Sequence, residues 1–371
     1  MIAPREAVLL DVTELCFNPW RGGIQRVERE AIRHWPGPRP LLACRRVAGG
    51  GLAALPEAIL PLLAAGGPRA AIARLAARGR VLARPWTNPL LHLELFLGAE
   101  AGAFYRGLAG GGFGPVCWLV YDFLPVLRPE FYPQGMALWF MPYLRALRGV
   151  DRRAFISAAT RAAWLERLGG VGGGPVLPLG ADGLGLARAR FDPARRDFLM
   201  LGTIEPRKGV AEVLRAFRAL WEGGVEARLV LIGRIAEQGA AAEAALLGEL
   251  AGEPRLVHWP QAADDAVRAA FAGARALLFP SAAEGFGLPA IEALAAGVPV
   301  VARADLPSLA GLAGGGRILL AETTAEAIAA AVRRLLDDGE AARRFAEAAR
   351  LSLPGWREFA ARLADWVPAG R

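Results

Sequence analysis

The sequence has few cysteines and no long apolar run free of charge and proline. Its 371 residues include three widely spaced cysteines, Cys16, Cys44 and Cys117, with no C-x-x-C pair. This odd number favours free thiols in a reducing compartment over disulfides or a zinc site. The most apolar region, residues 51–68, is interrupted by prolines and a glutamate, so a membrane-spanning helix is not expected. Charged residues near the N-terminus are unlike the apolar core of a signal peptide, and we expect a cytoplasmic protein.

Histidine is equally scarce. His34, His92 and His258 are scattered along the chain. No cluster of His, Asp and Glu has the spacing of metal ligands. The sequence therefore predicts no metal site.

Lysine is almost absent. The chain has 43 arginines and one lysine, Lys208, which lies in the segment EPRKG. In a chain that uses arginine at almost every basic position, a single lysine is more readily explained by a functional need for lysine at that position than by chance. A compact ammonium can point at a diphosphate, while the adjacent Arg207 offers planar, bidentate donors. The alternative is a stray surface lysine, but a cation at a helix start opposes the helix dipole.

The excess of positive over negative charge lies in the first half of the chain. Residues 1–180 carry a net charge of +9 and residues 181–371 carry −1. A basic half can meet nucleic acid, an anionic membrane or an acidic substrate. Arg26, Arg29 and Arg33 share one face of the first expected helix. This face either meets such a partner or is simply exposed to solvent. No nucleic-acid motif accompanies the charge, so we expect no nucleic acid as partner and keep peripheral contact with the anionic inner membrane as an alternative.

Strand and helix patterns alternate in both halves. In the first half, strands are expected over residues 7–11, 41–46, 116–121, 154–157 and 176–179, and helices up to His34 and over 134–148 and 158–168. In the second half, strands are expected over 198–201, 228–232, 255–258, 276–279 and 298–301, and helices over 209–222, 237–250 and 263–272. Residues 49–115 give no clear order, residues 180–196 are an expected linker, and residues 323–367 are mainly helical. Such alternation predicts parallel sheets that bind ligands at the carboxyl ends of their strands.

The most informative segment is FPSAAEGFGLPAIEALAAGVPVV, residues 279–301. It predicts a strand, a glycine-containing loop, a helix that opens at Pro289 and a further strand. A helix N-terminus of this kind favours a phosphate. Glu284 in the loop and Glu292 in the helix can accept hydrogen bonds from sugar hydroxyls, a combination that suits a nucleotide-sugar. As alternatives, Glu292 is a solvated helix residue and Glu284 a charge that favours the helix dipole.

This segment resembles the E-x7-E motif of the retaining GT-B glycosyltransferases, the large family known as glycosyltransferase family 4 or group 1. Further matching segments follow in order: GGIQRV (22–27), YDFLP (121–125), PEFYP (129–133), ISAAT (156–160), VLPLG (176–180), LMLGTIEPRKGV (199–210), the strand at 229–233 and LPSLAG (306–311). The resemblance implies an α/β fold of GT-B type, in which two Rossmann-like domains with parallel sheets face each other across a cleft. Residues 1–180 would form the acceptor domain, 181–352 the nucleotide-sugar donor domain and 353–371 a helix that crosses back to the first domain.

The resemblance also implies roles for individual residues. Glu292 would bind the ribose hydroxyls and Glu284 the transferred sugar. Arg207 and Lys208 would neutralise the diphosphate. The other donor-binding candidates are Gly22, Gly23, Tyr121, Gly202, Gly285, Phe286, Gly287 and Leu288, and the catalytic candidates are Glu284, Arg207, Lys208 and Asp122.

Two positions depart from the family pattern. Tyr121 stands where many relatives carry histidine, so a hydrogen bond to the donor is still expected but a positively charged ring is not. Asp122, beside it, has the alternative role of capping a turn before Pro125. Ser308 replaces a glutamate of the LPEVAG segment, and we predict no site residue there.

The implied activity is a retaining, metal-independent transfer of a hexose to a glycan or glycolipid acceptor in cell-surface polysaccharide synthesis. No cofactor is expected besides the nucleotide-diphosphate sugar, for which GDP-mannose is the first guess. Two alternatives remain. One is a nucleotide-sugar epimerase of the same fold, which needs acid and base residues that the sequence does not show. The other is an inactive nucleotide-sugar-binding protein, against which the paired Glu284/Glu292 and Arg207/Lys208 argue.

Overall fold

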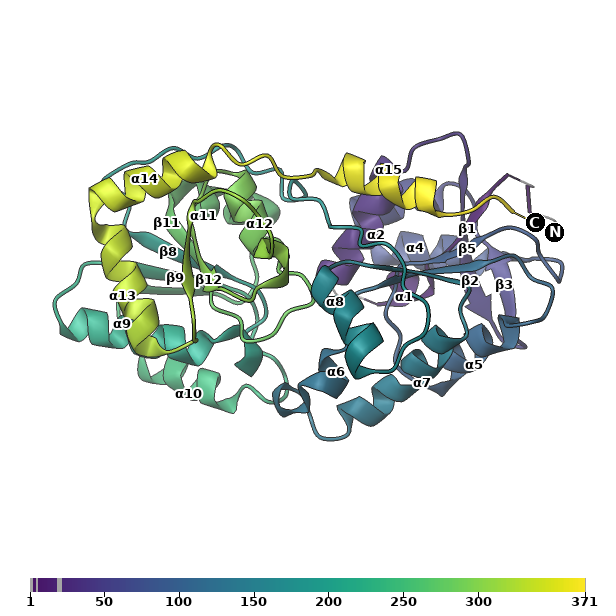
Figure 1. Ribbon diagram of the computed structural model, residues 1–371, viewed down its shortest axis with the longest axis horizontal. Coiled ribbons are helices and arrows are strands. Elements are labelled where there is room, and N and C mark those ends of the chain that lie inside the picture. The colour runs from purple at the N-terminus through teal and green to yellow at the C-terminus, as the bar shows by residue number, and fades with distance from the viewer. Residues whose placement is uncertain (1–2, 5, 19–21, 371) are drawn as a thin grey trace. The chain divides into compact units, whose positions relative to one another are not determined.

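The computed structural model describes residues 3–4, 6–18 and 22–370. The chain divides into two compact units (Figure 1). The N-terminal unit comprises Met1–Leu127, Gln134–Gly180 and Pro354–Arg371, and the C-terminal unit comprises Arg128–Pro133 and Ala181–Leu353. Each unit is an α/β structure with its own sheet and its own apolar core.

The N-terminal unit contains a seven-stranded sheet in the order β4-β3-β2-β1-β5-β6-β7. The strands are β1 (Val8–Asp11), β2 (Leu41–Val47), β3 (Gly51–Ala54), β4 (Arg80–Val81), β5 (Leu90–His92), β6 (Val116–Val120) and β7 (Arg152–Phe155). Strands β2, β1, β5, β6 and β7 are parallel, while β3 and β4 add antiparallel pairs at one edge. The direction of strand addition reverses between β1 and β5, which is where an open α/β sheet offers a crevice at its carboxyl edge.

The strand predicted over residues 176–179 is wrong. Only Val176 forms an isolated bridge, to Phe155. Pro175 and Pro178 flank this bridge, and proline has no backbone N–H to donate to a ladder, so pairing cannot extend on either side.

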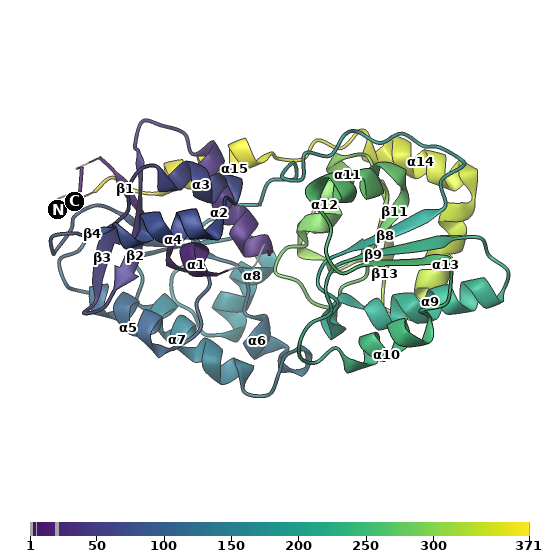
Figure 2. The same ribbon diagram turned by 180° about the vertical axis from the view of Figure 1, so that it is seen from behind.

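The helices of this unit are α1 (Thr13–Phe17), α2 (Gly23–His34), α3 (Ile59–Ala65), α4 (Arg69–Ala77), α5 (Ala99–Leu108), α6 (Leu124–Leu127), α7 (Met136–Arg148), α8 (Ala158–Ala162) with a π-helical turn at Ala163–Arg167, and α15 (Trp356–Trp366). Helix α15 packs against α2 (Figures 1 and 2). The backbone of Trp356 also lies so close to Gly180 that a Cβ there would be 2.4 Å from its nitrogen. The last helix of the chain is therefore part of the N-terminal unit.

The C-terminal unit has a six-stranded parallel sheet in the order β10-β9-β8-β11-β12-β13. Its strands are β8 (Asp197–Leu201), β9 (Arg228–Ile232), β10 (Leu256–Trp259), β11 (Ala274–Phe279), β12 (Val300–Arg303) and β13 (Arg317–Leu320). Its helices are α9 (Val210–Glu222), α10 (Ala241–Glu249), α11 (Asp264–Gly273), α12 (Leu288–Ala295), α13 (Ala325–Leu336) and α14 (Asp338–Ala348). Here the strand order reverses between β8 and β11, so the loops after these two strands border the expected ligand crevice.

The prediction of two α/β units is confirmed: the C-terminal sheet is parallel throughout, and the N-terminal sheet is parallel except for the pairs made by β3 and β4. The expectation that the two sheets face each other across a cleft stays a prediction. In the described part of the chain, no helix combines the length and apolar character needed to cross a bilayer.

Candidate functional site

The loops after β8 and β11 lie side by side at the carboxyl edge of the C-terminal sheet. The loop after β8 forms a 3-10 turn at Pro206–Lys208. The loop after β11 is tied to it by a backbone hydrogen bond in which the N–H of Ala282 donates to the carbonyl of Arg207 at 2.7 Å. Two segments more than 70 residues apart are thereby brought to the reversal point of the sheet, as the strand pattern predicts.

These two loops bring Glu284, Arg207 and Lys208 together. The Lys208 ammonium donates to one Glu284 carboxylate oxygen, and Arg207 Nη1 lies 3.0 Å from the other. Arg207 Nη1 also donates to the carbonyl of Ala283 at 3.0 Å, and Nη2 pairs with Glu205 at 2.7 Å. The Glu284 side chain is 9% exposed. The two loops thus hold a largely buried ion cluster with two cations and two carboxylates.

The ion pairs control the charge of Glu284. Burial alone would raise the pKa of this carboxyl, but the nearby Lys208 and Arg207 outweigh burial and lower it to about 2. Burial lowers the pKa of Lys208, and Arg207 acts in the same direction while Glu284 opposes both. Glu284 is therefore an anion at neutral pH, held against two cations.

This pKa predicts acid sensitivity. Because the folded pKa of Glu284 is about 2, below the ordinary 4.5, the folded chain binds fewer protons there than the unfolded chain. The contribution, about 3 kcal/mol, is complete above pH ~4.5 and is lost as the pH falls towards 2. Chemical denaturation from pH 7 to pH 3 should show wild type losing more stability than the Glu284→Gln variant. Equal losses in the two proteins would contradict the assignment.

The loop after β11 continues into a buried turn at the start of α12. The four candidates Gly285, Phe286, Gly287 and Leu288 are all buried. Gly287 has φ +102°, a left-handed conformation that glycine adopts without strain. A Cβ there would lie 2.8 Å from Leu306 Cδ1 and 3.1 Å from Ser308 Oγ. The sequence thus places glycine where the backbone turns and where a neighbouring segment approaches closely.

That neighbouring segment is LPSLAG, for which the sequence analysis predicted no site residue. The Ser308 N–H donates to the carbonyl of Phe286 at 2.9 Å, and its hydroxyl donates to the carbonyl of Gly287 at 3.2 Å. Ser308 therefore positions the loop through its backbone carbonyls. The position of this segment in the family pattern could have indicated that Ser308 contacts the loop. We predicted no site residue there because serine replaces the usual glutamate.

Glu292 lies in the second turn of α12 and is 1% exposed. A solvated helix position, the alternative raised from the sequence, is wrong. Glu284 is likewise paired within the ion cluster, so it does more than favour the helix dipole. The roles of both residues toward a ligand stay predictions.

Glycines shape the adjoining strand ends. Gly202 follows β8 with φ +139°, and its carbonyl oxygen would lie 1.9 Å from a Cβ on Gly233, which follows β9. His258 Nε2 is 2.9 Å from the carbonyl of Gly233, and Trp259 at the end of β10 is 36% exposed. The strand before Gly233 was predicted from the sequence, but Gly233 itself was not predicted as a site residue. Its close approach to Gly202 keeps the two loops together, and no side chain fits between them.

The candidates of the N-terminal unit lie at the carboxyl ends of other strands. Gly22 is the N-cap of α2 and Gly23 its first residue, and the Gly22 N–H donates to Gln25 Oε1 at 3.0 Å. Tyr121 follows β6, is 5% exposed and donates its hydroxyl hydrogen to the carbonyl of Leu93 at 2.5 Å. The hydroxyl hydrogen is thus used within the unit, and the contact of Tyr121 with the donor stays a prediction. The Asp122 carboxylate accepts from the Leu124 N–H at 3.0 Å, as expected of a turn cap.

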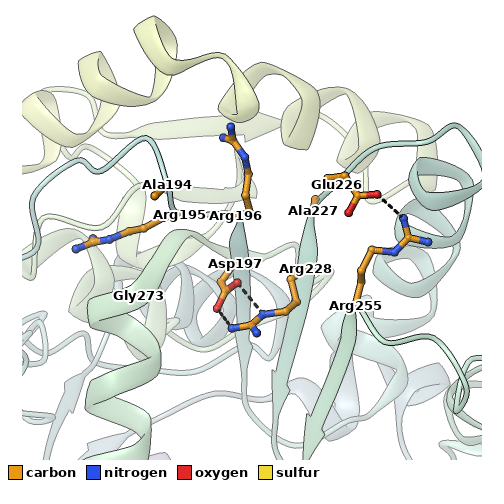
Figure 3. A pocket seen from close by; sticks show the side chains of 9 residues that line it. All are labelled: Ala194, Arg195, Arg196, Asp197, Glu226, Ala227, Arg228, Arg255 and Gly273. Carbon is orange, nitrogen blue, oxygen red and sulfur yellow. Dashed lines mark hydrogen bonds and ion pairs between the residues drawn. The ribbon is translucent and has the colours of Figure 1, made fainter.

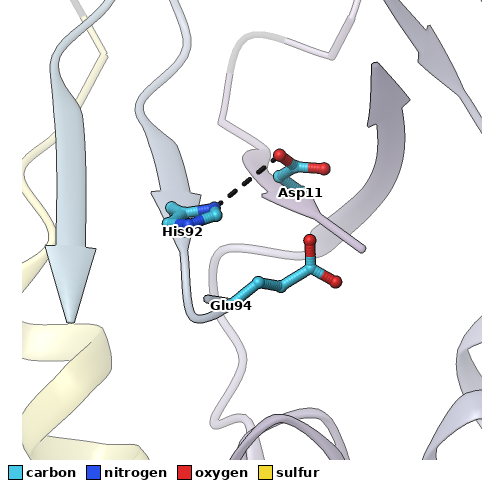
Figure 4. A group of neighbouring side chains, drawn as sticks. All are labelled: Asp11, His92 and Glu94. Carbon is cyan, nitrogen blue, oxygen red and sulfur yellow. Dashed lines mark ion pairs between the residues drawn. The ribbon is translucent and has the colours of Figure 1, made fainter. Parts of the chain in front are cut away.

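A buried polar cluster at the reversal point of the N-terminal sheet was not found by sequence reasoning. Asp11, His92 and Glu94 are each at most 1% exposed, and their ligand-type atoms lie within 4.8 Å of one another (Figure 4). The Tyr105 hydroxyl donates to Asp11 and lies 2.6 Å from His92 Nδ1. Arg46 Nη1 is 3.6 Å from the same Asp11 oxygen. The three groups span 83 positions of the chain, so no local spacing could have indicated them.

The cluster has the ligand types of a metal centre but a different charge balance. Burial alone would raise the pKa of Asp11, but Arg46 and His92 lower it, and burial lowers the pKa of His92. Glu94 accepts hydrogen bonds from the backbone N–H groups of Glu14 at 3.0 Å and Leu15 at 2.6 Å. The guanidinium of Arg46 lies beside Asp11 and acts as its counter-charge. Through Arg46 and Tyr105, the cluster joins the carboxyl ends of β1 and β5 to β2 and α5.

A pocket of the C-terminal unit lies at the opposite, amino edge of its sheet (Figure 3). It measures about 440 Å³ and is lined by Ala194, Arg195, Arg196, Asp197, Glu226, Ala227, Arg228, Arg255 and Gly273. Arg228 Nε lies 2.8 Å from Asp197, and Arg255 Nη1 lies 3.3 Å from Glu226. Because parallel sheets bind ligands at their carboxyl edge, this pocket is not the candidate site.

The segment that contains the ion cluster matches a known protein family. Residues 187–352 match the family model described as glycosyl transferases group 1. The C-terminal unit is a group 1 glycosyl transferase domain. The matched range includes both loops of the ion cluster and the whole of α12.

Relatives and solved structures agree with this assignment. The chain is 35% identical over 224 residues to the serotype-specific mannosyltransferase WbdA of Escherichia coli, an alignment that covers 54% of this chain and 27% of WbdA. The chain thus spans about a quarter of that relative. Sucrose-phosphate synthase from Thermosynechococcus elongatus aligns over 97% of this chain and 98% of its own, with a TM-score of 0.66 at 18% identity. Anabaena HepE with UDP-glucose aligns over the same shares with a TM-score of 0.67 at 16% identity. These two structures show that the fold is GT-B.

Proposed function

We propose that this chain is a glycosyltransferase that moves a hexose from a nucleotide-diphosphate sugar to a glycan or glycolipid acceptor. The observation that carries this proposal is the convergence of Arg207, Lys208 and Glu284 at the reversal point of a group 1 glycosyl transferase domain. When a nucleoside diphosphate leaves an anomeric carbon, negative charge develops on the phosphate. Preorganised cations stabilise that charge most where water is excluded, and this cluster is largely buried.

The ion cluster shows how these groups are held. Glu284 neutralises Lys208 and part of Arg207. A bound diphosphate would offer both cations new partners, because phosphate oxygens accept charge-assisted hydrogen bonds from both groups. Glu284 would then be free to accept hydrogen bonds from the hydroxyls of the transferred sugar. The buried Glu292 would bind the ribose.

The cations also support a retaining mechanism without a metal ion. Arg207 and Lys208 provide the positive charge that the leaving diphosphate requires. A phosphate oxygen would take the proton of the acceptor hydroxyl, so no separate base is needed. Asp122 is a weaker candidate for a catalytic role because its carboxylate caps a turn.

The relatives favour mannose as the transferred sugar. WbdA is a mannosyltransferase, and the aligned 224 residues are 35% identical to it. We therefore propose GDP-mannose as donor and synthesis of a cell-surface polysaccharide such as an O-antigen as the setting. HepE was solved with UDP-glucose, which makes UDP the first competitor to test.

A thermal-shift panel of GDP, UDP, ADP and dTDP tests this proposal, each with and without EDTA. We expect GDP to raise Tm the most, with no effect of EDTA, because ligands that bind only the folded chain stabilise it. No shift with any diphosphate would overturn the proposal. Release of GDP from GDP-mannose then separates the alternatives, since an inactive binding protein would be stabilised without turnover.

We further propose that the exposed face of α7 makes peripheral contact with an anionic membrane. Leu138 is 75% exposed and Trp139 is 65% exposed, and Arg145 and Arg148 on the same helix are exposed as well. Aromatic residues beside arginines are typical of helices that lie at a lipid surface. This face carries two of the arginines that make residues 1–180 basic.

Co-sedimentation with vesicles tests this contact. We expect binding to vesicles that contain anionic lipid, weakening as salt is added, and a reduction of about tenfold in the Trp139→Ala variant. Trp259→Ala removes a tryptophan from the other unit and should bind as wild type does. Binding that is unaffected by salt, or equal in the two variants, would contradict the proposal.

A further inference from the structure

A second polar pocket lies wholly within the N-terminal unit. It measures about 210 Å³ and is lined by Leu15, Cys16, Asn18, Arg29, Leu63, Gly66, Gly67, Arg69 and Ile72. These residues come from α1, α2, α3, α4 and the turns between them. Helix α2 contacts α3, and α4 contacts both α1 and α3 (Figure 2). At about 30 Å³ per water molecule, the pocket holds roughly seven waters, enough for a small anionic group and part of its carrier.

The charge of the pocket wall has one sign. Among the described residues that line it, the two charged side chains are Arg29 and Arg69. Asn18 adds an amide, which can donate or accept. Arg69 Nη2 donates to the carbonyl of Phe17 at 3.0 Å, which uses one of its five N–H groups. The wall therefore offers donors from two guanidinium groups on different helices.

The fold fixes one of these arginines against the wall. Gly66 ends α3 with φ +63°, and a Cβ there would lie 3.3 Å from Cζ of Arg29. A larger residue at this turn would have to displace the guanidinium group. Two buried acids, Glu28 and Glu94, lie near Cys16. Burial is the main cause that raises their pKa values, so they offset the positive charge of the arginines less than exposed carboxylates would.

We propose that this Arg29–Arg69 pocket binds a phosphoryl group carried by the acceptor sugar. A tetrahedral phosphoryl group accepts hydrogen bonds from several directions, as guanidinium groups on α2 and α4 require. The cations assigned to the donor diphosphate, Arg207 and Lys208, belong to the other unit, so this pocket would serve a different anion. The inference rests on the proposed function, because only a transferase has an acceptor.

Calorimetric titration of the full chain saturated with GDP tests the proposal with three probes: inorganic phosphate, mannose 6-phosphate and mannose. We expect mannose 6-phosphate to bind more tightly than either of the others. The Arg69→Gln variant should bind it about tenfold more weakly, because a charge-assisted contact is lost. Arg74→Gln removes the same charge from an exposed position of α4 outside the pocket, and should change the affinity less than twofold. Arg29→Gln should weaken binding as Arg69→Gln does.

Three results would overturn the proposal. Equal affinities in the Arg69→Gln and Arg74→Gln variants would mean that general charge attraction is at work. Tighter binding of inorganic phosphate than of mannose 6-phosphate would indicate a site for the free ion. Displacement of mannose 6-phosphate by GDP would place the probe at the donor site. If GDP itself fails to bind, the proposed function fails, while the three titrations without GDP still report on this pocket.

Discussion

Replacing Glu284 with glutamine is expected to lower sugar transfer by about 100-fold and the free energy of unfolding by about 3 kcal/mol. Glutamine keeps the size of the side chain and an acceptor oxygen but removes the charge. Lys208 and Arg207 would then remain largely buried with Glu205 as the nearest carboxylate partner in the cluster. Removing one partner of a buried ion pair costs more than the pair contributes, because the remaining charge stays desolvated.

The control for this prediction is Glu205→Gln. Glu205 pairs with the same Arg207 at 2.7 Å, but its side chain is 22% exposed. We expect a loss of less than about 1 kcal/mol and little change in transfer. Urea denaturation measures the stability, and release of GDP from GDP-mannose measures the activity. Similar effects of the two substitutions would contradict a special role of Glu284.

Replacing Gly287 with alanine is expected to destabilise the chain by about 2 kcal/mol and to abolish measurable GDP binding at concentrations that saturate wild type. The backbone conformation of Gly287, with φ +102°, is strained for alanine, and the new methyl group would meet Leu306 at 2.8 Å. Relief of this contact requires the loop to move away from the LPSLAG segment. The first turn of α12 would move with it.

Gly224→Ala is the matched control. Gly224 has φ +76° and nothing within 4 Å of an added Cβ, so alanine there is strained only by its backbone. We expect a loss of about 1 kcal/mol and unchanged GDP binding. Unchanged GDP binding by Gly287→Ala as well would show that this turn does not shape the donor site.

The sequence predicted the C-terminal unit well because its information is local. The strands from β8 to β12 are short and mainly apolar, and helix α9 between two of them has a clear amphipathic period. The pairing of the Glu284 loop with the EPRKG turn then follows from topology, since both lie after strands at the reversal point of one sheet. The sequence did not reveal that Glu284 itself pairs with both cations.

The N-terminal unit was harder to predict because its central features depend on distant contacts. Strand β5 has only three residues, Leu90–His92, yet it lies in the middle of the sheet. The Asp11, His92 and Tyr105 cluster forms only when β1, β5 and α5 meet. The strand expected over residues 176–179 failed because two prolines limit its pairing to a single bridge.

Tyr121 illustrates how a residue that matches a family pattern can also make a contact inside its own unit. Its place after β6 fits a family position at which a side chain contacts the donor. A phenol is longer than an imidazole, and here its hydroxyl reaches the carbonyl of Leu93 inside the unit. Burial and this hydrogen bond direct the ring to the core, which the sequence alone could not reveal.

The central claim is that Arg207 and Lys208 bind the diphosphate of a nucleotide-sugar. Calorimetric titration of GDP into wild type and into a variant with both residues replaced by glutamine, in EDTA, tests it most directly. We predict one GDP bound per wild-type chain and an affinity at least tenfold lower in the variant, whose fold is checked by circular dichroism. Equal affinities in two folded proteins, or no binding by wild type, would contradict it.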